Sequence, residues 1–351
     1  MNLLPLPKVE LHLHLEGCIS PAEARILADR KPTGRGIGPS DLAACYRHRG
    51  LRDFLVHFGR LVDLLAAPSD LAWLFRRVQG RLDRQGVVYA ELRVSPSVWE
   101  RHGLPAEETL DALLDAARSG VPRCSFIIDG VRQWDRRSLV RDFELALGRR
   151  RRGVVAFGLG GDEEAAPSRQ FEELAQEARK RRFPIIPHAG EGLGAGEVAS
   201  ALDVFDPPRI GHGVRAAESP ALVAELARRG THLEVCPTSN RRTGAVPRGK
   251  RHPLAQLWAA GVSLSIGTDD PALFRTTLSR ELQWTSRRLG WGPRELARSQ
   301  ELAARASLLP RAERESLERF VAAGWNAGAL PGEGGGPTIG NRGDGACWTR
   351  V

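Results

Sequence analysis

The sequence predicts an α/β protein, a (β/α)8 TIM barrel with extra helices capping the C-terminal face of the barrel. Short apolar runs alternate with amphipathic segments, eight runs are strand-like, and additional helical segments follow the first of them. Alternating strands and helices are typical of a parallel sheet. A length of 351 residues suits one barrel domain.

The eight expected strands are short and apolar, and several are rich in Val and Ile, as strands buried on both faces usually are. They are Val9–His14, Val87–Val94, Cys124–Asp129, Val154–Leu159, Pro184–Pro187, Arg209–Gly211, His232–Cys236 and Val262–Ile266.

Helical patterns lie between these strands and after the last one. The first begins after Ser20, a good N-cap, with proline at the first helical position. The expected helices are Pro21–Asp29, Leu51–Leu65, Asp70–Arg84, Pro105–Ala117, Ser138–Leu147, Arg169–Lys180, Pro220–Arg229, Pro253–Ala260, Thr277–Leu289, Pro293–Leu309 and Ala312–Ala323. Residues 1–327 are therefore expected to form one domain, and the glycine-rich residues 328–351 a disordered tail.

The overall composition argues against nucleic-acid and membrane functions. The formal charge is +9, but the basic residues are mostly arginines scattered over predicted helices, without interleaved aromatic residues for stacking on bases. No apolar stretch reaches the length of a membrane span, and the N-terminus does not resemble a signal peptide. Five dispersed cysteines without a CxxC pair suggest reduced thiols, so we expect a cytoplasmic protein.

Candidate metal ligands stand at the ends of the expected strands. His12 and His14 are two residues apart, so in a strand their side chains share one face. Barrel enzymes place their active sites at the C-terminal ends of the strands. The other candidates also follow strands; they are His188, His212, Asp269 and Asp270. Three imidazoles and a carboxylate suit zinc, with one position left for water.

Glu191 lies three residues after His188, where its carboxyl group could shuttle protons near a metal. A loop carboxylate or helix cap is the ordinary alternative, since Gly190 and Gly192 flank it. Five further histidines do not share the strand-end placement and are expected to be structural or surface residues; they are His48, His57, His102, His232 and His252.

Taken together, these motifs resemble the adenosine deaminase family, a branch of the amidohydrolase barrels. The matching stretches come in family order and cover residues 5–325; they are KVELHLHLEG, YAELRVSP, FGLGGDE, PHAGEG, RIGHG, LEVCPTSN and SIGTDDP. The resemblance implies hydrolytic removal of the 6-amino group of a purine nucleoside, with one Zn²⁺ per chain.

The resemblance also implies a role for each matched residue. His12, His14, His188 and Asp269 would bind zinc. Glu191 would donate a proton to N1 of the purine, and His212 would orient the attacking water. Asp270 would accept a hydrogen bond near N7, and the backbone N–H of Gly161 would contact N3, where glycine permits close approach. His14 would contact the substrate as well.

Two departures from the family pattern concern the substrate. Glu16 stands where the adenosine enzymes usually carry an aspartate that contacts the ribose, and Gly158 and Gly160 replace the usual Asp and Ala. These features resemble the 6-aminodeoxyfutalosine deaminases of menaquinone biosynthesis, whose substrates carry a benzoate at the 5′ end. Glycine at 158 could leave room for it, and Arg93 is a candidate partner for its carboxylate; a salt bridge at a strand end is the alternative role of Arg93.

Several functions therefore stay open. Adenosine and 6-aminodeoxyfutalosine are both candidate substrates, with the latter favoured, and free adenine comes third. A catalytically inactive nucleoside-binding relative is a further alternative, although the matched metal and proton-transfer positions are all retained. The expected partner is a small-molecule purine nucleoside, and the sequence leaves the oligomeric state open.

Overall fold

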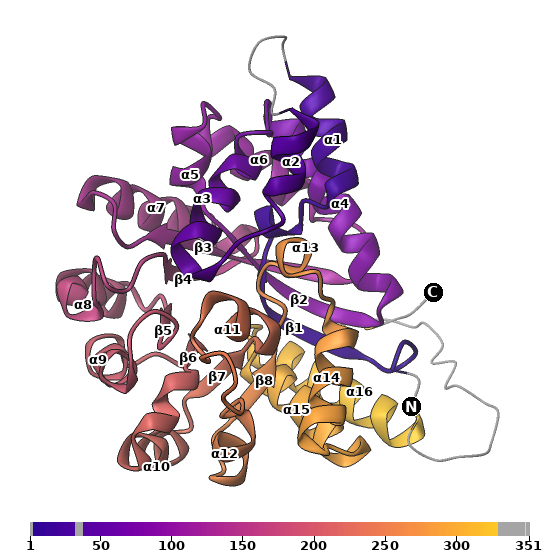
Figure 1. Ribbon diagram of the computed structural model, residues 1–351, viewed down its shortest axis with the longest axis vertical. Helices are drawn as coiled ribbons and strands as arrows, with labels where there is room; N and C mark the ends of the chain where they lie inside the picture. Colours follow the sequence, from indigo (N-terminus) through magenta and orange to yellow (C-terminus); the bar gives the residue numbers. More distant parts are fainter. Residues whose placement is uncertain (1–2, 32–37, 329–347, 349–351) are drawn as a thin grey trace.

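The computed structural model describes residues 3–31, 38–328 and 348. Eight parallel strands pair in chain order, β1 through β8. The seam between β8 and β1 is held by a parallel bridge between Leu13 and Asp269, where His14 N–H donates to Asp269 O at 2.8 Å and Asp269 N–H to His12 O at 2.8 Å. The strands form a barrel surrounded by helices (Figure 1), so the predicted (β/α)8 fold is confirmed.

The strands agree closely with the expected ones. The second, Val87–Val94, has the expected bounds, and the others shift by one or two residues at one or both ends. In order, β1 to β8 are Lys8–His14, Val87–Val94, Arg123–Val131, Val154–Gly160, Ile185–Ala189, Arg209–His212, His232–Val235 and Leu264–Ile266.

The helices pack outside the barrel and over the carboxyl ends of its strands. The first, α1, begins with a capping box in which Ser20 and Glu23 exchange side-chain and backbone hydrogen bonds. The α-helices, α1 to α16, are Pro21–Arg30, Pro39–Ala44, Gly50–Val62, Pro68–Arg84, Pro96–Arg101, Ala106–Ala116, Arg136–Gly148, Glu172–Arg181, Ala195–Phe205, Pro220–Arg229, Pro237–Thr243, Leu254–Ala259, Pro271–Phe274, Leu278–Leu289, Pro293–Ala306 and Arg311–Gly328. No helix of the described chain combines the length and apolar character of a membrane span.

Five helices were not expected from the sequence, namely α2, α5, α9, α11 and α13. The longest of them, α9, follows glycines 190, 192 and 194 and has a further glycine in its first turn, which hides the helical pattern. The expected glycine-rich tail lies outside the described residues apart from Gly328, which ends α16, and Trp348, whose indole packs edge-on against Tyr89.

The barrel interior contains buried charges that pair between strands, both neighbouring and distant in the sheet. Arg209, on β6, forms ion pairs with Glu91 on β2 and with Glu234 on β7, where its Nε donates to Glu234 Oε1 at 2.6 Å. Its Nη1 also donates to the carbonyl of Ala306 at the end of α15, at 2.8 Å. All three charged side chains are almost fully buried, so each depends on the others for compensation.

We predict that Arg209→Ala destabilises the fold strongly, because it leaves Glu91 and Glu234 buried with less compensation. Breaking a buried pair typically costs about 3–5 kcal/mol in the free energy of unfolding. Thermal melting measures the effect. The control is Arg228→Ala on the surface of α10, where the ion pair with Glu225 is exposed and contributes little. Equal melting temperatures for the two variants would contradict the prediction.

Candidate active site

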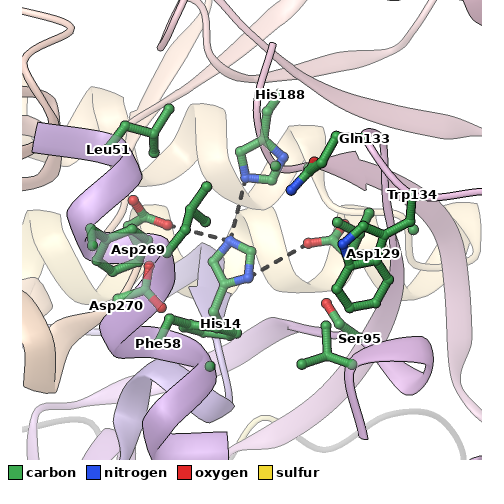
Figure 2. Close-up of a pocket in the computed structure, with 18 of the residues that line it drawn as sticks. His14, Leu51, Phe58, Ser95, Asp129, Gln133, Trp134, His188, Asp269 and Asp270 are labelled. Atoms are coloured by element: carbon green, nitrogen blue, oxygen red, sulfur yellow. Dashed lines mark hydrogen bonds and ion pairs between the residues drawn. The ribbon is translucent and has the colours of Figure 1, made fainter. Parts of the chain in front are cut away.

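A pocket opens at the carboxyl ends of the strands, with α3 across one side (Figure 2). Strand-end side chains line its floor, and an apolar face of α3 covers it; among them are His14, Asp129, His188, Asp269, Leu51, Phe54, Leu55 and Phe58. The extra helices between β1 and β2 thus contribute to the site, as the sequence predicted.

Five of the predicted residues converge at this pocket, and three of them, His14, His188 and Asp269, line it. Potential ligand atoms of His12, His188, His212 and Asp269 all lie within 4.8 Å of one another. His14 joins them, because its Nε2 is 3.3 Å from Asp269 Oδ1 and 3.3 Å from His188 Nε2. Residues separated by more than 250 positions in the chain therefore converge on one point.

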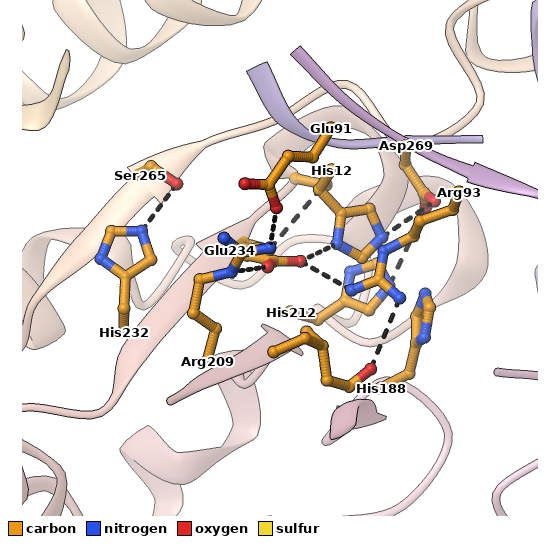
Figure 3. A network of polar contacts seen from close by, with 12 residues as sticks. His12, Glu91, Arg93, His188, Arg209, His212, His232, Glu234, Ser265 and Asp269 are labelled. Carbon is orange, nitrogen blue, oxygen red and sulfur yellow. Dashed lines mark hydrogen bonds and ion pairs between the residues drawn. The ribbon is translucent and has the colours of Figure 1, made fainter. Parts of the chain in front are cut away.

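Outer contacts orient the histidine rings toward this point. His12 Nδ1 lies 2.7 Å from Glu234 Oε2 (Figure 3), and His188 Nδ1 lies 3.2 Å from the carbonyl oxygen of Leu159. Such contacts fix a tautomer and leave Nε2 free for a metal ion. Figure 3 also shows Glu234 with His12 and Arg93 on one side of its carboxylate and Arg209 on the other.

The cluster fits a metal ion by its chemistry. His12 Nε2 is buried and has no hydrogen-bond partner among the described residues, although buried polar atoms rarely stay unpaired. Burial lowers the pKa of His14 to about 3 and that of His188 well below its usual value. The neutral imidazole is the form that binds metals, and three imidazoles with one carboxylate make a donor set that suits zinc.

Glu191 lies beside this cluster in a firmly anchored loop. The carboxylate of Glu163 accepts hydrogen bonds from the N–H groups of Glu191, Gly192 and Leu193 at 3.0, 3.1 and 2.7 Å. The Oε2 atom of Glu191 lies 3.4 Å from His212 Nε2. Burial, with the neighbouring charges of Asp269 and Glu163, raises the pKa of Glu191 well above its usual value. A carboxyl group in this state can act as a proton donor.

Asp270 and Gly161 also line the pocket. A Cβ atom on Gly17 would lie 1.8 Å from Asp270 Oδ1, so glycine at 17 makes room for this carboxylate. Gly161 has a φ of +105°, and a Cβ there would lie 2.2 Å from Gln133 Oε1. Both positions thus require glycine. The carboxylate of Asp270 and the backbone of Gly161 can therefore approach a ligand closely.

Two cluster residues adopt left-handed backbone conformations that are unfavourable for side chains. His212 has a φ of +60° and Asp269 a φ of +63°. Such conformations typically cost about 1–3 kcal/mol each and gather at functional sites, where the surrounding structure enforces them. The fold therefore strains its backbone to aim these two side chains into the pocket.

The sequence model of the adenosine deaminase family matches residues 7–323. The chain belongs to the adenosine deaminase family. This confirms the resemblance drawn from the motifs, and deaminase relatives across most of the chain make the protein a hydrolytic deaminase. The family's barrel depends on a metal, which agrees with the cluster of His and Asp side chains.

Known proteins resemble the chain over most of its length. The aminodeoxyfutalosine deaminase of Acidothermus cellulolyticus is 37% identical over 83% of this chain and 85% of its own. The adenine deaminase of Chelativorans sp. is 36% identical over 79% and 86%. The crystal structure of an adenine deaminase from Arthrobacter aurescens covers 91% of this chain and 98% of its own with a TM-score of 0.83, at 27% identity.

The placement of Arg93 differs from the hypothesis that it meets a substrate carboxylate. Its side chain is fully buried and does not line the pocket. Arg93 Nη1 donates to Asp129 Oδ1 at 2.8 Å and Nη2 to Glu234 Oε2 at 2.9 Å. Both carboxylates already compensate its charge, which agrees with the alternative interpretation of Arg93 as a salt bridge near a strand end.

Glu16 and Gly158 also differ from their expected roles at the substrate. Glu16 is buried outside the pocket lining, where Oε1 accepts from Ser95 N–H at 3.0 Å and Trp99 Nε1 at 2.7 Å. A Cβ on Gly158 would lie 1.6 Å from Asp129 Oδ1. The space beside Gly158 is therefore filled by Asp129 and leaves no room for a substituent.

Sequence reasoning missed three residues of the site. Asp129 lines the pocket near the end of β3, and its position at an expected strand end, the same signal that indicates His188, could have identified it. Asn240 Nδ2 lies 3.0 Å from His212 Nδ1, and Glu234 contacts His12. Both belong to the matched LEVCPTSN stretch, where their roles depend on contacts across the barrel.

We predict that a His12→Ala, His14→Ala double variant loses the metal ion, because it removes two of the imidazoles that converge on one point. Elemental analysis of purified protein should fall from about one metal per chain toward none. The control is His232→Ala, which removes a buried histidine bonded to Ser263 and Ser265 outside the cluster. Full metal content in the folded double variant would refute this site.

Proposed function

We propose that the protein is a zinc-dependent deaminase that hydrolyses the 6-amino group of a purine nucleoside. The observation that carries the proposal is the placement of Glu191 beside His212 at the edge of a buried metal-binding cluster, with Asp270 in the same pocket. One proton donor, one base and one metal site are what hydrolytic replacement of an aromatic amine requires.

His12, His14, His188 and Asp269 would hold one zinc ion per chain. When bound, zinc lowers the pKa of a water molecule and so supplies a nucleophile near neutral pH. His212 Nε2, buried and without a hydrogen-bond partner among the described residues, is placed to orient that water and accept its proton. The low pKa of His212, about 3 because of burial, keeps the imidazole neutral and able to accept.

The remaining residues act on the purine ring. Glu191 donates its proton to N1, which lets the ring accept electrons as water oxygen bonds to C6. The C6–N bond then breaks, and ammonia leaves with one proton of the water, delivered by His212. The other water proton leaves the oxygen as the 6-oxo product forms and restores the carboxyl group of Glu191. Asp270 binds the ring near N7, and the N–H of Gly161 contacts N3. His14 lines the pocket and also contacts the substrate.

We propose a substrate larger than adenine, with 6-aminodeoxyfutalosine ahead of adenosine. The pocket extends beyond the purine-binding residues to an apolar wall that includes Phe58, Val98 and Trp134, with His102 among its further lining residues. Such a wall favours an aromatic substituent on the sugar. Relatives described as aminodeoxyfutalosine deaminases, 37% identical to this chain, support this choice.

Deamination of free adenine is the second candidate. Its support is the similarity to relatives described as adenine deaminases, among them that of Chelativorans sp.. An inactive nucleoside-binding protein is a weaker alternative, because proton donor, base and metal cluster lie within contact distance of one another.

We predict that Glu191→Gln nearly abolishes turnover while metal and nucleoside binding persist, because the amide keeps the shape but delivers no proton. Ammonia release gives the rate, elemental analysis the metal content, and ligand-induced thermal shift the binding. The matched control is Glu164→Gln, an exposed carboxylate paired with Arg52, which should keep full activity. A loss of only a few-fold in kcat would remove Glu191 from proton transfer.

We predict that 6-aminodeoxyfutalosine is deaminated with a higher kcat/KM than adenosine, and adenosine with a higher value than adenine. The apolar wall would contribute binding energy to the larger substrate alone. Ammonia release from the three compounds in parallel measures the order. A higher kcat/KM for adenosine than for 6-aminodeoxyfutalosine would make adenosine the preferred substrate. A higher value for adenine than for both nucleosides would make the free base the preferred substrate.

A further inference from the structure

Asp129, at the carboxyl end of β3, has one paired and one unpaired carboxylate oxygen. Oδ1 accepts from Arg93 Nη1 at 2.8 Å. Oδ2 is buried without a hydrogen-bond partner among the described residues, and its ion-pair distance to His14 Nδ1 is 3.6 Å. The side chain nevertheless lines the pocket, so a bound molecule can reach this oxygen.

Asp129 lies across the pocket from Asp270, the proposed partner of N7. In Figure 2, Asp269 and Asp270 are on one side of the His14 ring, and Asp129, Ser95 and Trp134 are on the other. Gly161, the proposed partner of N3, lies beside Gln133 on the same side as Asp129 (Figure 2), and N3 is close to N9 in the purine ring. The half around Asp129 therefore faces the part of the nucleoside attached to N9 of the purine.

The position of Asp129 depends on a glycine in the neighbouring strand. A Cβ on Gly158 would lie 1.6 Å from Asp129 Oδ1 and 2.8 Å from Arg93 Nη1. Any larger residue at 158 would displace the carboxylate or its arginine. The chain thus provides a specific place for this carboxylate, and Arg93 holds Oδ1 so that Oδ2 is the oxygen left for the pocket.

The other acidic residue near this half does not line the pocket. Glu16 Oε1 is bonded to Ser95 N–H and Trp99 Nε1, and Glu16 Oε2, although also without a hydrogen-bond partner in the described part of the chain, lies outside the pocket lining. Gln133 Oε1, also on this wall, accepts from Asp162 N–H at 3.0 Å. Asp129 Oδ2 is therefore the free carboxylate oxygen available in this half of the pocket among the described residues.

We propose that Asp129 is a specificity-determining residue that accepts a hydrogen bond from a hydroxyl group on the sugar of the substrate. The inference rests on the proposed function, because it places N7 of the purine beside Asp270 on the opposite side of the pocket. A buried acceptor without a partner is costly, and a substrate hydroxyl removes that cost. A site built this way rejects substrates that lack the hydroxyl.

The experiment compares adenine, adenosine and the 2′-, 3′- and 5′-deoxy forms of adenosine with wild type and Asp129→Asn. With wild type, one deoxy form should lose about tenfold to a hundredfold in kcat/KM relative to adenosine. Asp129→Asn should cause a similar loss with adenosine, no further loss with that deoxy form, and no change with adenine. Gly158→Ala, which displaces the carboxylate by a second route, should repeat the pattern.

Two measurements separate substrate recognition from a structural effect. Metal content should stay unchanged in Asp129→Asn, since the residue is not assigned to the metal. The control Asp142→Asn changes a buried aspartate of α7 outside the pocket lining and should leave every ratio between substrates unchanged. Coupling between the Asp129 variant and one particular hydroxyl is the result that supports the proposal.

Three results would overturn it. Loss of metal with equal slowing of all substrates, adenine included, would make Asp129 a positioning residue for His14. If the wild-type protein is active but has the same kcat/KM for adenosine and for each of its deoxy forms, no sugar hydroxyl is recognised. The inference about Asp129 then fails, while the proposed function stands. If the wild-type protein releases ammonia neither from any compound of the panel nor from 6-aminodeoxyfutalosine, the proposed function fails and this inference fails with it.

Discussion

The site depends on one buried carboxylate, Glu234, which three cationic or polar groups share. Its oxygens lie 2.7 Å from His12 Nδ1, 2.9 Å from Arg93 Nη2 and 2.6 Å from Arg209 Nε. Arg93 and Arg209 hold the pKa of Glu234 well below its usual value against the opposing effect of burial. A charged Glu234 keeps the proton of His12 on Nδ1, so that Nε2 faces the cluster. The electrostatics of the barrel interior thus set the chemistry at its carboxyl end.

Much of the fold and site could be predicted from sequence because their signals are local. Apolar runs identified all eight strands, and His or Asp at the strand ends identified the cluster. What failed depends on distant contacts. Nothing near Arg93 in the chain indicates that Asp129 and Glu234 bury its charge, and Glu16 gives no local sign that it caps Ser95 and Trp99. A carboxylate or guanidinium near a site can be predicted, but not its partner.

Gly158 illustrates how the space left by a small residue on one strand is filled by a charged side chain from the adjacent strand. Its missing side chain was expected to enlarge the pocket, yet that volume holds the carboxylate of Asp129 from the neighbouring strand. Small residues in a barrel therefore need to be interpreted with the side chains of adjacent strands. The extension of the pocket comes instead from α3 and from Val98 and Trp134, outside the barrel itself.

The seam of the barrel has a consequence for how the protein matures. The bridge between Leu13 and Asp269 joins the first strand to the residue after the last, and both flanking segments carry members of the cluster, His12, His14 and Asp269. During synthesis the two histidines emerge from the ribosome more than 250 residues before their carboxylate partner. The residues of the cluster therefore come together only after translation has passed β8, late in the synthesis of the chain.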